Sequence, residues 1–276
     1  MTKQYNNALS HKLINTICYG RLTLESGVPI SSTDQTAKTT LFFTPYNGDV
    51  VGLYDGSEWD LFEFNELSLS LSGLAANTNF DIFIYNNNGV LTLEATAWTN
   101  DSTRATGLAF QDGVYVRSNA TTRRYLGTIR TTGTIGQCED STTRRLVWNL
   151  YNQTTRHLYT PYSAAHTYTT SAWRPFNNNT TIGQGRHDYV LGLTSYLTLM
   201  VQGQANSACL LAAGVDTTTS PASPYGGAST ALANFGFVSQ VTSILGAGYH
   251  FTQSLEYGYA SGSLNGGYIN TTIYGQ

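Results

Sequence analysis

The segment 41–64 reads LFFTPYNGDVVGLYDGSEWDLFEF and places two tight-turn dipeptides between apolar runs. The dipeptides are Asn47-Gly48 and Asp55-Gly56. Asn, Asp and Gly tolerate the positive φ angles that two-residue hairpin turns require, and no other short pattern signals a hairpin as strongly. The segment therefore predicts three antiparallel strands joined by two hairpins.

Similar patterns of short apolar runs and turn residues continue along the chain. Residues 67–72 alternate Leu and Ser, which predicts a strand with one buried face. Further hairpins are expected about Asn88-Gly89 and about Asn119. Strands at this close spacing, with no helical apolar period of a dozen residues, favour an antiparallel sandwich or barrel.

The composition supports the same fold class. Charged residues are only 11% of the chain, which would suggest disorder if aromatics were scarce, but aromatics reach 12% and include 19 Tyr. No apolar run is long enough to cross a bilayer, and the first twenty residues have no apolar signal core. We expect an all-β protein made in the cytoplasm, without a membrane partner. Its three Cys are expected to be buried thiols.

The predicted organisation is two antiparallel β-sandwich or jelly-roll-like domains. An N-terminal segment (1–19) precedes a first β-sandwich (20–133), and a polar, Gly-containing linker (134–145) leads to a jelly-roll-like domain (146–276). Seven stretches of the second domain are expected to form strands: 146–152, 166–173, 188–203, 208–216, 235–246, 248–260 and 268–275. The loop at 221–229 is expected to project from its surface, where binding loops often lie.

The charges are distributed unevenly. Residues 1–103 carry a balance of −7, whereas residues 104–156 carry eight Arg against three carboxylates, a balance of +5. All three Lys lie in the acidic part, so we expect no nucleic-acid partner. Arg forms bidentate, partly buried ion pairs well, which favours an assembly surface instead. The candidates for this charged surface are Arg117, Arg123, Arg124, Arg144 and Arg145.

The sequence shows no catalytic constellation. Its densest acidic group, between Asp55 and Glu66, falls on a turn and a strand, which favours a solvated face over a glycosidase pair. The five His are scattered without metal-ligand spacing, and there is no nucleophile elbow or P-loop. We expect no enzymatic activity, no cofactor and no metal.

Aromatic side chains on β loops are the residues that carbohydrate sites use, because sugar faces stack on aromatic rings. The alternative for each such residue is a place in the core or on the surface of a sheet. The candidates for glycan binding are Trp173, Tyr225, Tyr257 and Tyr259.

Residues 20–133 resemble a module of bacteriophage virion proteins described as tail-fibre, minor structural or head-decoration proteins. The shared phrases are YDG-x-x-W at 54–59, LSGL at 71–74, AWTNDSTRA at 97–105 and RRYLGT at 123–128. The resemblance implies a non-enzymatic component of the virion that binds other virion proteins and forms a homo-oligomer, a trimer by analogy with phage fibres. The alternative is a tail fibre or tailspike that binds a host surface glycan.

Overall fold

The computed structural model shows a protein built almost entirely of β-strands, which confirms the predicted all-β fold class. Contacts divide the chain into two units, and we describe each by itself. The first unit comprises the chain up to residue 140 together with 146–153, and the second comprises 141–145 and 154–275. The structure describes residues 14–162, 165–205, 209–222, 226–228, 235–259 and 263–274.

A three-stranded antiparallel sheet forms one layer of the first unit, in the order β1-β3-β6. Its apolar side chains, such as Leu41 and Phe43, are buried. In β1, Gly20 leaves room for the ring of Phe43, because any Cβ at that position would collide with the ring. The strands are β1 (Gly20–Thr23), β3 (Thr40–Pro45) and β6 (Leu67–Ser70).

The larger sheet of the first unit follows the order β8-β7-β11-β10-β9, with β14 pairing with β11. Its side chains pack with those of the smaller sheet in one hydrophobic core, which includes Leu22, Ile82 and Leu126. The strands are β7 (Asn79–Asn87), β8 (Val90–Ala97), β9 (Leu108–Gln111), β10 (Val114–Arg117), β11 (Ala120–Arg130) and β14 (Val147–Asn149).

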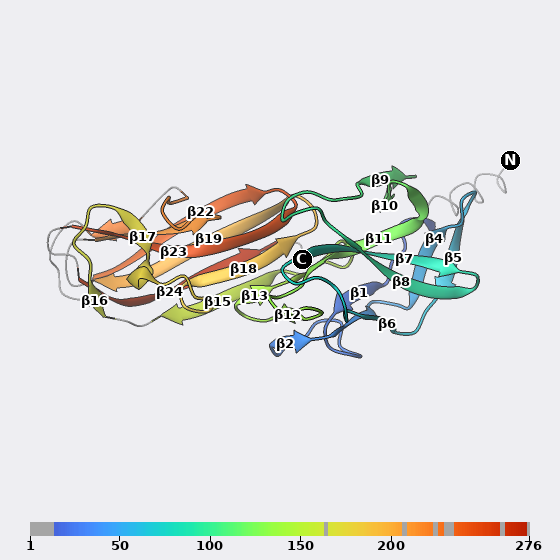
Figure 1. Ribbon diagram of the computed structural model, residues 1–276, viewed down its shortest axis with the longest axis horizontal. Helices are drawn as coiled ribbons and strands as arrows, with labels where there is room; N and C mark the ends of the chain where they lie inside the picture. The colour runs from blue at the N-terminus through green and yellow to red at the C-terminus, as the bar shows by residue number, and fades with distance from the viewer. Residues whose placement is uncertain are drawn as a thin grey trace. The chain divides into compact units, whose positions relative to one another are not determined.

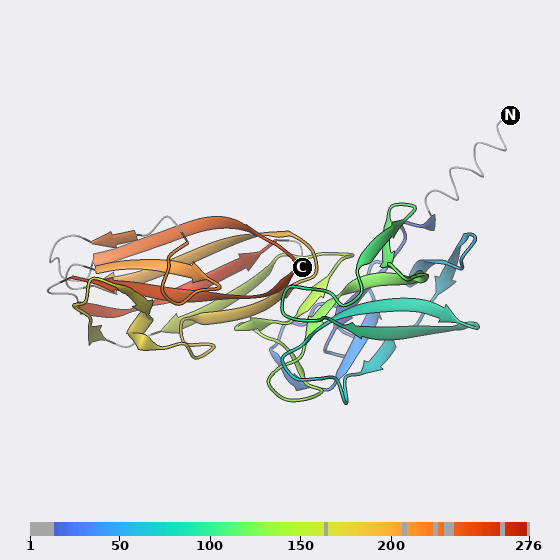
Figure 2. The same ribbon diagram turned by 45° about the horizontal axis from the view of Figure 1, so that its top comes forward.

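Three of the predicted hairpins are confirmed. The β7–β8 hairpin, whose strands run side by side in Figure 2, turns at Asn88-Gly89, where both residues have positive φ. The β10–β11 hairpin turns about Asn119. The pair β4 (Val50–Tyr54) and β5 (Trp59–Glu63) turns about Asp55-Gly56. There the Asp55 carboxylate accepts the backbone N–H groups of Ser57 and Glu58, which fixes the turn.

The hairpin predicted at Asn47-Gly48 is wrong. Both residues do have positive φ, and the chain does turn there. However, β3 pairs with β1 and β6, while β4 pairs with β5 in a different sheet. Both edges of β3 are therefore occupied by strands that are not its neighbour across this turn.

The predicted linker contributes to both units. Cys138–Asp140 forms β12, which pairs with β2 (Gln35–Lys38) in the first unit, and Arg144–Arg145 forms β13 in the second. The boundary also lies later than residue 146, because Trp148 in β14 is 1% exposed and β14 completes the sheet of the first unit. The apolar residues of β14 explain this placement, since the core buries them.

The second unit is a sandwich of two sheets with long strands (Figure 1). One sheet has the order β15-β24-β19-β22, with β16 added to β24. The other has the order β13-β18-β23-β20-β21, with β17 added to β23. The strands are β15 (Arg156–Tyr162), β16 (His166–Thr167), β17 (Trp173–Pro175), β18 (Arg186–Leu191), β19 (Ser195–Ala205), β20 (Cys209–Val215), β21 (Gly226–Ala228), β22 (Phe235–Leu245), β23 (Gly248–Gly258) and β24 (Ser263–Ile273).

Two details of the second unit correct the sequence interpretation. The stretch 188–203, taken as one strand, is split between β18 and β19, which belong to different sheets. Strand β15 was not predicted, although its burial alternates along its length. Part of the 221–229 loop lies outside the described residues, and β21 within it pairs with β20.

A buried histidine links the two sheets of the second unit. The His187 ring in β18 lies 3.0 Å from Thr160 Oγ1 and 3.1 Å from Thr271 Oγ1, and both threonines belong to the opposite sheet. Burial, with a contribution from the charge of Arg145, lowers the pKa of His187 to about 3. The ring is therefore neutral at physiological pH and acts as a hydrogen-bonding tie.

Candidate functional site

The second unit brings together three of the four aromatic candidates. Trp173 in β17 is the register partner of Tyr257 in β23, and their ring centroids lie 5.4 Å apart. Tyr257 in turn lies 5.4 Å from the ring of Tyr259, which is 39% exposed. We call Trp173, Tyr257 and Tyr259 the aromatic row. Tyr225, the fourth candidate, lies outside the described residues.

A buried carboxylate holds the strands of the aromatic row in place. Glu256 precedes Tyr257 and therefore points to the opposite face of β23. It is fully buried and accepts hydrogen bonds from Arg174 Nε at 2.7 Å and from the backbone N–H of Asn177 at 3.0 Å. His166 Nε2 lies 2.6 Å from its second oxygen. These contacts join β16, β17 and η1 (Phe176–Asn178) to β23.

Gly258, between the two tyrosines, is required by a close backbone approach. A Cβ at this position would collide with the carbonyl of Tyr168. The Arg174 guanidinium lies over the Tyr168 ring, 3.7 Å from the ring centroid. The short Tyr-Gly-Tyr sequence therefore places two rings side by side where a larger middle residue would separate the strands.

The aromatic row can supply apolar ring faces and tyrosine hydroxyls, which suit a flat, hydroxyl-rich ligand. The described part of the chain contains no group of three or more His, Cys, Asp or Glu side chains placed to hold a metal ion. In the acidic group of the first unit, Asp60 and Glu63 are exposed on β5, and Glu66 accepts hydrogen bonds from Ser26, Gly27 and Thr44.

The arginine candidates are divided between the two units. In the first unit, Arg117 and Arg123 both pair with Glu94, and the Arg123 guanidinium lies 3.7 Å from the Tyr85 ring centroid. In the second unit, Arg144 Nε lies 4.0 Å from Asp188, and Arg145 donates to the carbonyl of His157.

Arg124 was predicted to lie on the charged surface, and this is wrong, because its side chain is buried and the residue is 1% exposed. Its Nη1 donates to the carbonyls of Asn15 and Gly52, at 2.8 and 2.7 Å, and its guanidinium lies 4.5 Å from the Tyr151 ring centroid. These partners are distant in sequence, so nothing in the local pattern distinguished it from Arg123. Its role is to tie together parts of the first unit.

The residues that support the aromatic row were not predicted. Glu256, His166 and Arg174 carry no local motif, and they meet only because β16, β17 and β23 come together. A further hairpin, β9–β10, turns at Asp112-Gly113 with positive φ at both residues. The Asp-Gly dipeptide was the signal that could have predicted it.

No protein-family model matches this chain, and no curated protein matches it. Among solved structures, the chain is similar to the insecticidal delta-endotoxin Cry8Ea1 of Bacillus thuringiensis (8% identity, TM-score 0.30) and to a Cry1Da tryptic core variant of the same organism (5%, TM-score 0.27). The matches cover 92% and 87% of this chain, and the chain spans about half of each of those chains, 51% and 48%. It is also similar to BuGH86 crystallised with neoagarooctaose, at 12% identity and a TM-score of 0.25, over 87% of this chain and 34% of that one. Likenesses this weak carry no argument about function.

Proposed function

We propose that this protein is a non-enzymatic structural component of a bacteriophage particle that acts by binding other virion proteins. The supporting observation is that the phrases shared with phage virion proteins occupy positions on which the first unit depends. The resemblance therefore covers a series of strands and turns along the first unit. This is more specific than a shared amino-acid composition.

The YDG-x-x-W phrase builds the β4–β5 hairpin. Tyr54 and Trp59 pair across it with ring centroids 5.5 Å apart, and Trp59 Nε1 donates to Asp112 at 2.9 Å. The RRYLGT phrase lies in β11, whose Tyr125 and Leu126 are buried. Both phrases thus serve the packing of the unit, as expected of a module kept for its fold and assembly.

The arginine candidates of the first unit do not favour a nucleic-acid role. Arg117 and Arg123 pair with Glu94 and Arg124 is buried, so these three do not form a free basic stripe. Under this proposal the protein is made in the host cytoplasm, is incorporated into the virion and forms a homo-oligomer.

The test is to locate the protein in purified particles. Cryo-electron microscopy, with quantitative mass spectrometry of the virion, should find it at a fixed copy number on the head or the tail. Its absence from particles whose genome encodes it would refute the proposal.

The aromatic row favours a second candidate function, a tail fibre or tailspike protein that binds a host surface glycan without cleaving it. Titration against host polysaccharide should then show saturable binding that Trp173→Ala or Tyr259→Ala weakens at least fivefold, since a stacked ring contributes about 1 kcal/mol or more. Phe110→Ala is the matched control, because this 64% exposed ring lies on β9 of the first unit. Equal loss of binding in the control, or no binding by the unaltered chain, would exclude this function.

A further inference from the structure

One sheet of the second unit carries three long strands without a single charged residue. Strands β19, β22 and β24 each have 11 residues, and none of them contains Asp, Glu, Lys or Arg. Their inward side chains, such as Leu197, Leu199 and Ile273, are fully buried against the opposite sheet. The outward side chains alternate with these and form the other face of the sheet.

Large apolar and aromatic side chains stand on this outer face. Five of them are 46 to 59% exposed, and we call the surface that they mark the tyrosine face: Tyr159, Tyr196, Val238, Ile244 and Tyr274. Single exposed apolar residues are ordinary, but five on one sheet are not scattered.

The strand register aligns these residues in rows. Tyr196 faces Ile244 on β22, and on its other side the backbone N–H of Tyr274 donates to the carbonyl of Tyr196. The next outward row is made of Thr198 with Thr242 and Thr272, its partners on either side, and His157 of β15 continues it beside Thr272. Tyr159 lies in the row after that, opposite Asn270. The outward side chains of β19, β22 and β24 therefore form a surface without Asp, Glu, Lys or Arg.

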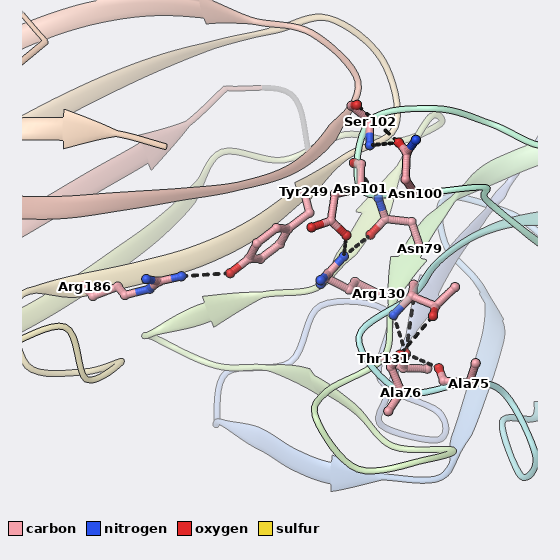
Figure 3. Close-up of polar contacts among 11 residues, drawn as sticks. Ala75, Ala76, Asn79, Asn100, Asp101, Ser102, Arg130, Thr131, Arg186 and Tyr249 are labelled. Carbon is pink, nitrogen blue, oxygen red and sulfur yellow. Dashed lines mark hydrogen bonds and ion pairs between the residues drawn. The ribbon is translucent and has the colours of Figure 1, made fainter. Parts of the chain in front are cut away.

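The opposite sheet of the same unit carries charged residues. On its outer face, Arg186 Nε pairs with Asp188 at 2.8 Å, its Nη2 donates to the Tyr249 hydroxyl (Figure 3), and its guanidinium lies 3.9 Å from the Phe251 ring centroid. Asp188 is 5% exposed, so this pair is largely buried and does not mark a free surface. Charges on a sheet oppose its association with other sheets. The strands β19, β22 and β24 contain no such charged residue.

We propose that the tyrosine face packs against the tyrosine face of a second copy of this chain. A surface without charge does not repel itself across a two-fold axis, and two-fold dimers are the commonest homo-oligomers. Depletion of charge with enrichment in Tyr and Met is typical of interface cores, and Met200 lies at the centre of β19.

The size of the face also fits this partner. With a rise of about 3.3 Å per residue and about 4.8 Å between strands, the three 11-residue strands and the 7-residue β15 cover about 630 Å². A standard protein interface buries about 800 Å² on each partner. Packing of two such faces gives an aligned arrangement of sheets, like that within a β-sandwich.

The inference rests on the assembly function proposed above and names the face and the partner. It is tested on the purified full-length chain by sedimentation velocity, without any virus particle, so its failure would leave the particle test unaffected. We expect the unaltered chain to sediment as a dimer at micromolar concentration. Tyr196→Glu and Ile244→Lys should each raise the dissociation constant at least a hundredfold, while Val90→Lys, at a 65% exposed position on β8 of the first unit, should leave it unchanged.

A second pair of variants separates loss of the interface from loss of folding. Thr198→Lys and Thr198→Glu should each dissociate the dimer with an unchanged far-ultraviolet circular dichroism spectrum, and an equimolar mixture of the two should associate again through opposite charges. A monomeric or odd-numbered unaltered chain would overturn the proposal. So would variants of the tyrosine face that remain dimeric, or folded Thr198 variants that fail to associate when mixed.

Discussion

Arg104 holds Asp81 through both carboxylate oxygens, with Nε to Oδ2 at 2.6 Å and Nη2 to Oδ1 at 3.2 Å. Asp81 is nearly inaccessible, and it also accepts the hydroxyl of Thr128, which in turn accepts that of Tyr125. Burial raises the pKa of Asp81, and the charge of Arg104 opposes that rise. The pair thus compensates a charge that would otherwise be costly inside the first unit.

We predict that Asp81→Asn destabilises the first unit by about 3 kcal/mol, because it leaves the guanidinium of Arg104 without its counter-charge. The free energy of unfolding in urea measures this. Glu94→Gln is the comparison. Glu94 pairs with Arg117 and Arg123, and all three side chains are 24 to 28% exposed, so its loss should cost less than about 1 kcal/mol. Equal effects of the two substitutions would contradict the role assigned to burial.

Gly127→Ala should destabilise the first unit by about 1–3 kcal/mol, since overpacking a tight site displaces the backbone. A Cβ at Gly127 would collide with the carbonyl oxygen of Trp148 on β14. Gly107→Ala is the control, because the nearest atom to its new Cβ would be Ser118 Oγ at 3.8 Å. Thermal melting of both variants tests this prediction, and a neutral Gly127→Ala would mean that β14 does not pack closely on β11.

Acid should weaken the second unit through His187. Its folded pKa, about 3, lies below the unfolded value of about 6.5, so the unfolded chain binds the additional proton as the pH falls. The stability due to a neutral His187 is complete above about pH 6.5 and is lost toward pH 3, by about 2–3 kcal/mol at pH 4.5. Unfolding measured between pH 7 and 4.5 should show a shallower dependence in His187→Gln, and an unchanged dependence would contradict this account.

The three thiols should be unreactive in the native protein. Cys18, Cys138 and Cys209 are free and buried, and burial raises the pKa of Cys18 and of Cys209 to about 11. Since the thiolate is the reacting species, iodoacetamide at pH 8 should modify none of them until urea is added. Mass spectrometry after short exposure checks this, and rapid native labelling of one thiol would show that its surroundings open.

The features predicted correctly from sequence are local ones. Asp55-Gly56 and Asn88-Gly89 form the turns of hairpins because each dipeptide by itself favours the required backbone angles. Asn47-Gly48 has the same chemistry and also turns, but the pairing of its flanking strands is decided by distant residues. Turn chemistry therefore predicts where the chain reverses, and not which strands pair.

The candidate site shows the same limit. Trp173 and Tyr257 were separate candidates, and only the pairing of β17 with β23 places them 5.4 Å apart. Arg124 was grouped with the other arginines of the basic stretch 104–156, whereas its burial depends on Asn15, Gly52 and Tyr151. Such contacts arise from topology, which a single sequence does not encode in any short pattern.

The path of the chain through the two units has a consequence for synthesis on the ribosome. The chain leaves the first unit at residue 140, contributes 141–145 to the second, and returns with 146–153. The first unit cannot complete its core until Trp148 has emerged from the ribosome. The strand β13 cannot pair until its partner β18 has been synthesised. A nascent chain released or cleaved at residue 145 would expose the uncovered strand β11, so the two units mature in an overlapping order and not one after the other.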